Sequence, residues 1–256
     1  MTGENHSVAV EVKSLDKQFG NIHAVRDVSF SVKHGEVLGF LGPNGAGKST
    51  TMKMITGFLE PTAGTVIVNG HDVTIDPIKV KSSIGYLPEG APSYGEMTVL
   101  SFLRFIAEIR GFSGSEMDER ISSVVAKINL EAVLGQTIET LSKGFKRRVG
   151  MAQTIIHDPD VLIMDEPTDG LDPNQKHEVR SLIKEMAEKK AIIISTHILE
   201  EVDAICSRAI IITSGQLLFD GTPSELRSKS EKNDIDDAFR IITTEHYQKQ
   251  GEVAHS

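Results

Sequence analysis

Hydrophobic and polar residues alternate along two stretches near the N-terminus, residues 8–13 and 28–33. Alternation with a period of two is typical of strands that bury one face. Residues 37–41 are instead uniformly apolar and lead through a glycine-rich turn into a helix-compatible stretch, residues 48–57. The pattern predicts a half-buried antiparallel pair and then a fully buried strand that feeds a helix, with a further strand at residues 66–68.

Apolar residues recur at helical spacing from residue 98 to about residue 156, with Gly111 and Gly114 between the first two helices. Beyond this block, apolar runs alternate with helical stretches, at residues 161–164, 179–186, 192–194 and 199–205. Such alternation is typical of a parallel sheet covered by helices. The sequence therefore predicts an α/β fold with a parallel sheet, an N-terminal antiparallel β subdomain and an α-helical subdomain inserted at about residues 88–158.

The chain becomes polar and charged after Leu226, apart from a small apolar patch within residues 239–242. We predict one domain over residues 1–228. The remaining residues, 229–256, are expected to form a polar tail with a short docked helix and a frayed end.

The sequence predicts neither a membrane span nor an export signal. The longest aliphatic runs, residues 191–194 and 209–212, are far shorter than the roughly 20 residues that cross a bilayer. The polar residues 1–7 lack the apolar core of a signal peptide. The chain is therefore expected in the cytoplasm, and any role at a membrane requires a partner that spans it.

Composition places the chain among globular proteins, since 39% of its residues are hydrophobic and 25% are charged. The net charge of −9 argues against broad nucleic-acid binding, which requires a basic surface to displace phosphate counterions. We therefore expect a solvated acidic surface and no nucleic-acid partner. The single cysteine, Cys206, is expected to pack on an apolar helix face.

The strongest chemical signal is a glycine-rich segment between the buried strand and the helix. It matches the phosphate-loop pattern and consists of Gly42, Pro43, Asn44, Gly45, Ala46, Gly47, Lys48, Ser49 and Thr50. Such a loop directs backbone N–H groups and a helix N-terminus at phosphates. Lys48 would neutralise the β- and γ-phosphates and the Ser49 hydroxyl would bind Mg²⁺, so ATP and Mg²⁺ are the expected ligands. The strand before the motif and the helix after it argue against a plain turn.

The apolar strand at residues 161–164 ends in two adjacent acids, Asp165 and Glu166. Successive side chains of a strand point in opposite directions, so the two carboxylates are aimed differently. Asp165 suits the Mg²⁺ shell, whereas Glu166 is placed to polarise the attacking water. Strands that run out to solvent often end in acids, so the pair alone is weak evidence for a site. Together with the phosphate loop it predicts a site for Mg²⁺ and water.

Together these motifs resemble those of the ATP-binding subunits of ABC transporters, and the similarity covers about residues 8–226. Residues 141–145 (Leu-Ser-Lys-Gly-Phe) resemble the ABC signature, in which Ser142 and Gly144 would contact the ATP of a partner subunit. His197 resembles the family's switch histidine. The resemblance gives as expected catalytic residues Lys48, Glu166 and His197.

Two further positions match the family pattern. Asp172 lies in a segment, residues 169–172, that resembles the loop through which the subunits of a dimer touch. Phe19 falls where the family stacks an aromatic ring on adenine. Taken without the other motifs, Ser142 would be a helix cap, His197 a satisfied polar residue and Phe19 a core residue before a turn.

The chain departs from the family pattern at three positions. Lys143 and Phe145 replace the usual glycine and glutamine of the signature. Glu89 replaces the glutamine of the glutamine loop; it can still bind Mg²⁺, but it adds a negative charge and lacks an amide donor, and a solvated loop acid is the alternative. These variants resemble the branch that works with ABC-2-type permeases, which includes gliding-motility-associated, multidrug and copper-maturation exporters.

The resemblance implies that two subunits, expected as a homodimer, enclose two ATP molecules, closing on ATP binding and opening after hydrolysis. It also implies a separate membrane-spanning permease, gripped at the cytoplasmic face of the membrane by the inserted helices and the loop around Glu89. One alternative is a soluble ABC ATPase acting on ribosomes or DNA, which the single phosphate loop, the single signature and the lack of heptads disfavour. A P-loop kinase is another, although the signature has no role there.

Overall fold

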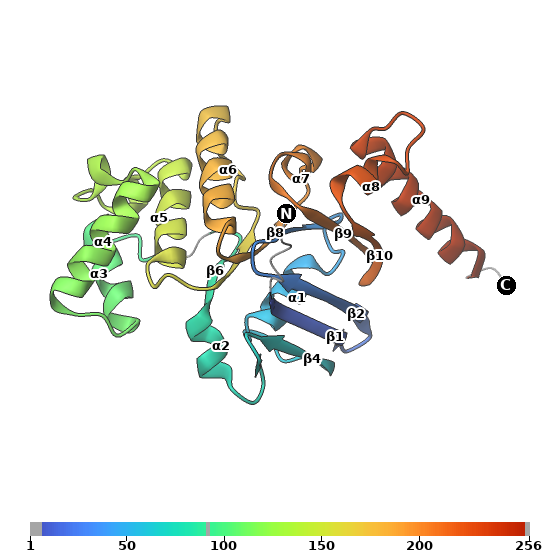
Figure 1. The fold of residues 1–256 in the computed structure, drawn as a ribbon, viewed down its shortest axis with the longest axis horizontal. Helices are drawn as coiled ribbons and strands as arrows, with labels where there is room; N and C mark the ends of the chain where they lie inside the picture. The colour runs from blue at the N-terminus through green and yellow to red at the C-terminus, as the bar shows by residue number, and fades with distance from the viewer. Residues whose placement is uncertain (1–6, 91–92, 254–256) are drawn as a thin grey trace.

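The computed structural model describes residues 7–90 and 93–253 of the chain. Two sheets lie near the middle of the molecule, and helices flank them at both ends of its long axis (Figure 1). In chain order the elements are β1 (Val8–Phe19), β2 (Ile22–Lys33), β3 (Val37–Leu41), α1 (Lys48–Ile55), β4 (Ala63–Val68), β5 (His71–Asp72), α2 (Pro77–Ser83), β6 (Ile84–Leu87), α3 (Val99–Ile109), α4 (Gly114–Ile128), η1 (Glu131–Val133), η2 (Ile138–Thr140), α5 (Lys143–Ile155), β7 (Val161–Asp165), α6 (Pro173–Ala187), β8 (Ala191–Thr196), α7 (Leu199–Ile205), β9 (Arg208–Thr213), β10 (Gln216–Gly221), α8 (Pro223–Arg227) and α9 (Ile235–Val253).

The larger sheet has the strand order β10-β9-β3-β8-β7-β6. The strands from β9 to β6 run parallel, whereas β10 pairs antiparallel with β9. Every residue of β3, β7 and β8 is buried, as expected for strands covered on both faces. The predicted parallel sheet is confirmed. Because these strands are parallel, the carboxyl ends of β3, β7 and β8 meet at one edge, where the predicted site residues follow them.

The smaller sheet is antiparallel, with the order β2-β1-β4-β5, as the alternating residues predict. β1 and β2 are each 12 residues long and extend well beyond the predicted strands. The register between them shifts at several points, and Ser14 and Asp27 have φ angles of 43° and 47° there. Such irregularities interrupt the period of two, so the alternation in the sequence covers only part of each strand.

The helices α3, α4 and α5 lie side by side at one end of the molecule (Figure 1). The chain leaves the parallel sheet at Leu87 and re-enters it at Val161, although β6 and β7 pair directly with each other. The three helices share an apolar core that includes Phe102, Val124 and Val149. This helical block is therefore inserted in the chain between two strands that are neighbours in the parallel sheet.

The described part of the predicted tail forms the helix α9, which has 19 residues and is much longer than the short helix predicted. It docks through Ala238 against Ile211 and Leu226. Beyond this contact the helix continues over glutamate, glutamine and lysine, whose helix propensity is high but whose polarity leaves no apolar period to detect. A frayed end was also predicted; the last three residues, 254–256, lie outside the described part of the chain, as do the first six residues.

Cys206 follows the last residue of α7 and packs against the parallel sheet. A Cβ placed on Gly39 of β3 would lie 2.8 Å from its Sγ. Burial raises the pKa of the Cys206 thiol, which keeps the sulfur protonated at neutral pH. The prediction that this cysteine packs is confirmed.

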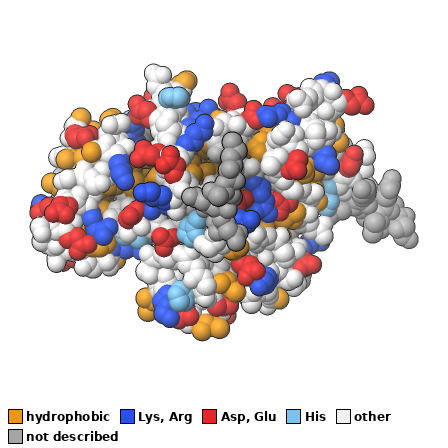
Figure 2. Space-filling model, in the orientation of Figure 1, with side chains coloured by type: hydrophobic (Ala, Val, Ile, Leu, Met, Phe, Trp, Pro, Cys, Tyr) orange, Lys and Arg blue, Asp and Glu red, His pale blue; other side chains and the backbone are white. Residues whose placement is uncertain are grey.

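Acidic and basic side chains are interspersed over the face of the molecule that Figure 2 shows. Both signs occur over the helical block and over α8 and α9. This face therefore does not present a field of a single sign. Within the described residues, no helix has both the length and the apolar character that a bilayer span needs.

Candidate nucleotide-binding site

A pocket of about 500 Å³ opens at the edge of the parallel sheet where β3, β7 and β8 end. The residues that line it come from five separate segments of the chain: Ala24, Asn44, Gly45, Ala46, Gly47, Lys48, Ser49, Thr50, Glu89, Asp165, Glu166, Asp169 and His197. The fold thus brings most of the residues expected from the sequence into one cavity. It adds Ala24 of β2, which no motif marks.

The phosphate loop connects the end of β3 to the start of α1. Gly47 has a φ of +105°, and a Cβ on it would lie 2.5 Å from the carbonyl oxygen of Ala24. A Cβ on Gly42 would lie 2.2 Å from the carbonyl oxygen of Ile212. Because side chains are excluded at both positions, the loop can curl closely and present its N–H groups to the pocket beside the N-terminus of α1.

Lys48 lies at the start of α1 and is only 7% exposed. Its Nζ donates to the carbonyl oxygen of Gly42 at 2.7 Å and to that of Pro43 at 3.2 Å. Burial lowers the pKa of Lys48, and the nearby carboxylates of Glu166, Asp165 and Glu89 partly offset this effect. The loop therefore holds a cation at the floor of the pocket, where an anionic ligand would stabilise its charged form.

Asp165 ends β7 and is almost fully buried. The hydroxyl of Ser195, on the neighbouring strand β8, donates to its Oδ1 and fixes the carboxylate. Ser49, at the start of α1, also lines the pocket. Mg²⁺ prefers hard oxygen ligands and commonly binds through one or two protein groups together with substrate phosphates and water. This pair of oxygen donors fits that requirement.

Glu166 follows Asp165 and has a φ of 51°, in the left-handed region. For a residue other than glycine this conformation costs roughly 1–2 kcal/mol. The N–H of Glu166 donates to the carbonyl of Ser195 at 3.0 Å, and its Oε1 lies 2.8 Å from Nδ1 of His197. The Glu166 side chain is 12% exposed and that of His197 is 56% exposed. The carboxylate therefore lies inside the pocket and the imidazole at its mouth.

Glu89 lines the same pocket, near the phosphate loop. Sequence reasoning missed a buried cation next to this pocket, Arg147 of α5, which is 7% exposed. Its guanidinium donates to the backbone carbonyls of Asp165 and Glu166. An arginine on the apolar face of a helix is a signal that could have revealed it, because a buried arginine requires partners.

The two signature residues and Asp172 are not among the described residues that line the pocket. Ser142 caps α5, and Asp172 caps α6 through a capping box with Gln175. Gly144 packs so closely on α6 that a Cβ would lie 2.4 Å from Oε1 of Gln175. The cap lets α5 begin at Lys143.

Phe19 lies at the end of β1 and is 46% exposed. The alternative that it is a core residue is therefore wrong. The Nζ of Lys17 lies 5.1 Å from the centroid of its ring. Phe19 does not line the pocket, although Ala24 from the adjacent strand β2 does.

This chain is similar to known proteins in sequence and in fold. Residues 25–169 match the family model described as ABC transporter. The "Probable multidrug ABC transporter ATP-binding protein YbhF" of Escherichia coli (strain K12) is 37% identical over 92% of this chain, which spans 41% of that protein. The "ABC transporter ATP-binding protein NatA" of Bacillus subtilis (strain 168) is 36% identical over 85% of this chain and 89% of its own length.

A solved structure described as the ATP-binding subunit of an ABC transporter matches with a TM-score of 0.84 at 32% identity, over 92% of this chain and 99% of that one. Fold and site together define an α/β protein of the phosphate-loop class. The chain belongs to the ABC transporter family. The resemblance and the α/β fold predicted from the sequence are thereby confirmed, and the chain spans about two fifths of the length of its relative YbhF.

Proposed function

We propose that this chain binds ATP with Mg²⁺ and hydrolyses it to power a membrane ABC transporter, an exporter built on an ABC-2-type permease. The observation that carries the proposal is the single pocket in which the phosphate loop, Asp165 and the Glu166–His197 pair meet. The printed names of both relatives support it, since each describes an ATP-binding protein of an ABC transporter and one a multidrug transporter.

Phosphate binding rests on the loop between β3 and α1. Its N–H groups and the ammonium of Lys48 would hold the β- and γ-phosphates. Mg²⁺, held by Ser49 and Asp165, would neutralise charge on the same phosphates when bound. The exposed ring of Phe19, one strand away from Ala24 in the pocket wall, is available to stack on adenine.

Hydrolysis requires a water oxygen to bond to the γ-phosphorus while the bond from that phosphorus to the β–γ bridging oxygen breaks. Glu166 lies in the pocket and would accept the proton that the water loses. His197, at 2.8 Å from the Glu166 carboxylate, would keep that group oriented toward the water. ADP and phosphate are the products.

A second copy of the chain would complete the site. Ser142 is exposed at the N-terminus of α5, and it does not line this subunit's own pocket. The N-terminus of a helix is a ready site for a phosphate. The start of α5 would therefore contact the γ-phosphate held by the other subunit, so that ATP stabilises a closed dimer and hydrolysis lets it open.

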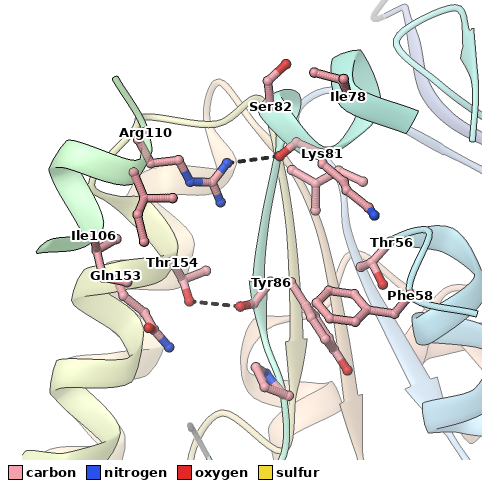
Figure 3. Close-up of a pocket in the computed structure, with 13 residues that line it drawn as sticks. Thr56, Phe58, Ile78, Lys81, Ser82, Tyr86, Ile106, Arg110, Gln153 and Thr154 are labelled. Atoms are coloured by element: carbon pink, nitrogen blue, oxygen red, sulfur yellow. Dashed lines mark hydrogen bonds between the residues drawn. The ribbon is translucent and has the colours of Figure 1, made fainter. Parts of the chain in front are cut away.

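A groove of about 620 Å³ between α2, α3, β6 and α5 is suited to the permease. Its walls carry large apolar side chains that are mostly exposed, namely Phe58 at 72%, Ile78 at 83% and Ile109 at 65%. In Figure 3 the ring of Phe58 faces that of Tyr86, whose centroid is 5.6 Å away. An exposed apolar hollow of this kind is typical of a binding surface for a protein partner.

Two cations and no carboxylate line this groove among the described residues. Arg110 donates through Nη1 to the carbonyl oxygen of Lys81 at 3.0 Å (Figure 3), and burial lowers the pKa of Arg110. The fitting occupant is a short amphipathic helix of the permease with an acidic residue on its apolar face. Pro88 lines the groove and Glu89 lines the nucleotide pocket, so adjacent residues connect the two sites. The chain would thus sit at the cytoplasmic face of the membrane.

The proposal is tested first on the purified chain. Phosphate release from ATP with Mg²⁺ should fall on the order of 100-fold in Lys48→Ala, whereas Lys53→Ala, exposed on the same helix, should retain normal activity. Glu166→Gln should bind ATP and elute as a dimer from a size-exclusion column. Normal turnover in Lys48→Ala would refute the assigned site.

The permease contact needs a separate test. The tagged chain, recovered from detergent-solubilised membranes, should bring down a membrane protein that mass spectrometry identifies as an ABC-2-type permease. Arg110→Glu should lose that protein, and Ile22→Asp, an exposed apolar residue far from the groove in sequence, should keep it. Equal recovery with both variants would exclude the groove as the contact.

A further inference from the structure

Arg147 joins three separate segments of the fold through one side chain. It lies near the start of α5 and donates from Nη1 to the carbonyl of Pro88 and from Nε to that of Pro167, both at 3.2 Å. Its Nη2 donates to the carbonyls of Asp165 and Glu166. The signature helix is thereby tied to the loop after β6 and to the turn after β7.

The hydrogen bonds of this buried arginine go to backbone carbonyls. Burial lowers the pKa of Arg147. Four carboxylates around the nucleotide pocket raise it again, because their negative charges stabilise the guanidinium at longer range. They are Asp165, Asp169, Glu166 and Glu89. A guanidinium bound to carbonyls fixes the path of the backbone, since its planar fork holds several acceptors in one geometry.

The backbone that Arg147 fixes is strained. Glu166 has a φ of 51°, and its carbonyl oxygen is one of the acceptors of Nη2. A residue in this region stays there only where the surroundings hold it. Without the arginine, the carbonyls of Asp165 and Glu166 would lose a charged donor, and the turn that aims the Glu166 carboxylate would be free to relax.

The other end of the connection serves a different nucleotide. Under the function proposed above, on which this inference rests, Ser142 and Gly144 at the start of α5 contact the ATP bound by the second subunit. Pro88, which Arg147 also holds, precedes Glu89 in the wall of the subunit's own pocket. The Arg147 guanidinium is therefore connected to its own subunit's nucleotide site through the backbone that it bonds, and to the other site through the helix that carries it.

We propose that Arg147 is a positioning residue that couples the two nucleotide sites of the dimer. It would hold the Glu166 turn and the Glu89 loop of its own site in register with the signature helix that completes the other site. ATP bound in one site then favours the arrangement of α5 that accepts ATP in the other, which makes binding and hydrolysis cooperative. Lysine cannot replace it, because a single ammonium cannot reach the carbonyls of both the loop after β6 and the turn after β7.

The test compares Arg147→Lys and Arg147→Gln with the full-length wild type. ATP affinity is measured with a fluorescent trinitrophenyl analogue of ATP at protein concentrations that keep the chain monomeric, and hydrolysis is followed across ATP concentrations. We expect monomer affinity to change less than about threefold and kcat to fall at least about tenfold, with a Hill coefficient near one. In the Glu166→Gln background, Arg147→Lys should form the ATP-dependent dimer at least about tenfold less readily.

Arg148→Gln is the matched control. Arg148 lies on the same helix but its Nη2 bonds the exposed Glu178 at 2.6 Å, so its loss should change the melting temperature without changing cooperativity. Should Arg147→Gln fail to fold, Arg147→Lys decides. An unchanged Hill coefficient and kcat in Arg147→Lys would overturn the coupling role alone. Failure of Glu166→Gln with an intact Arg147 to dimerise in ATP would overturn the proposed function and this inference together.

Discussion

Oε1 of Glu166 lies 2.8 Å from Nδ1 of His197, across the ends of two strands that are neighbours in the parallel sheet. The carboxylate is enclosed, whereas most of the imidazole is exposed. This contact holds the Glu166 carboxylate in one orientation inside the pocket that the phosphate loop also lines. A group that accepts a proton from water must be held in this way if the transfer is to be efficient.

His197→Ala should therefore impair the chemical step more than nucleotide binding. We expect kcat to fall on the order of 10- to 100-fold with a change in ATP affinity of less than about threefold. Steady-state phosphate release and fluorescent nucleotide titration measure the two effects. His177→Ala, exposed on α6, serves as the control. A rise in the dissociation constant of ATP that matches the fall in rate would show that His197 binds substrate instead.

Glu89→Gln should strengthen nucleotide binding. Glu89 faces the same pocket as Lys48 and adds a negative charge beside the expected phosphates. Removing that charge at a distance of several ångströms should raise ATP affinity by about two- to fivefold at low salt, and less at high salt because ions screen the repulsion. Isothermal titration at two salt concentrations measures it, with the exposed Glu96→Gln as control. A complete loss of affinity would identify Glu89 as an essential ligand.

Glu201 of α7 supplies a prediction about stability. It is fully buried, accepts a hydrogen bond from Thr196 Oγ1 at 2.8 Å, and has a second oxygen without a partner in the described part of the chain. Burial raises the pKa of Glu201. An acid with a raised pKa in the folded state costs no stability below its unfolded pKa, and destabilises the fold as pH rises through the folded pKa.

Glu201→Gln should keep the bond to Thr196 and remove the buried charge. We expect the free energy of unfolding to increase by about 1 kcal/mol at pH 7.5 and to match the wild type near pH 4. Urea denaturation at the two pH values measures the difference. Glu200→Gln changes a neighbouring glutamate that is 85% exposed, so it should have no such effect. A loss of stability in Glu201→Gln at pH 7.5 would mean that the ionised carboxylate stabilises the fold.

Local features of the chain were predictable because they depend on residues close in sequence. The buried strand β3, the phosphate loop and the start of α1 form one continuous segment, and its apolar run and glycines suffice to predict it. The acids at the end of β7 follow from the same kind of pattern. The length of α9 did not, because its second half is mostly polar and shows no apolar helical period.

Contacts between distant segments were not predictable. Ser195 bonds Asp165 because β7 and β8 pair in one register, and nothing in either strand alone selects that pairing. The carbonyl partners of Arg147 lie 20 and 59 residues away at Pro167 and Pro88. The sequence marks a helix after the signature, but the direction of each side chain depends on how that helix packs on the sheet.

His157 gives a prediction about acid stability. It lies between α5 and β7, and Nε2 is 3.1 Å from the carbonyl oxygen of Ile84, while Nδ1 is buried without a partner in the described residues. Burial lowers the pKa of His157 to about 4, and the positive charges of Arg110, Lys190 and Arg120 add to the effect. The neutral ring is therefore the form that fits this position.

A histidine whose pKa is lowered on folding contributes stability that is fully present above its unfolded pKa of about 6.5. That stability is lost as pH falls from there toward the folded pKa of about 4. We expect the wild type to lose about 2 kcal/mol through this residue between pH 7.5 and pH 5, and His157→Gln to lose correspondingly less. Urea denaturation across this range, with the exposed His177→Gln as control, isolates the contribution. Parallel stability curves for His157→Gln and the wild type would show that the ring takes up its proton in the folded chain as readily as in the unfolded one.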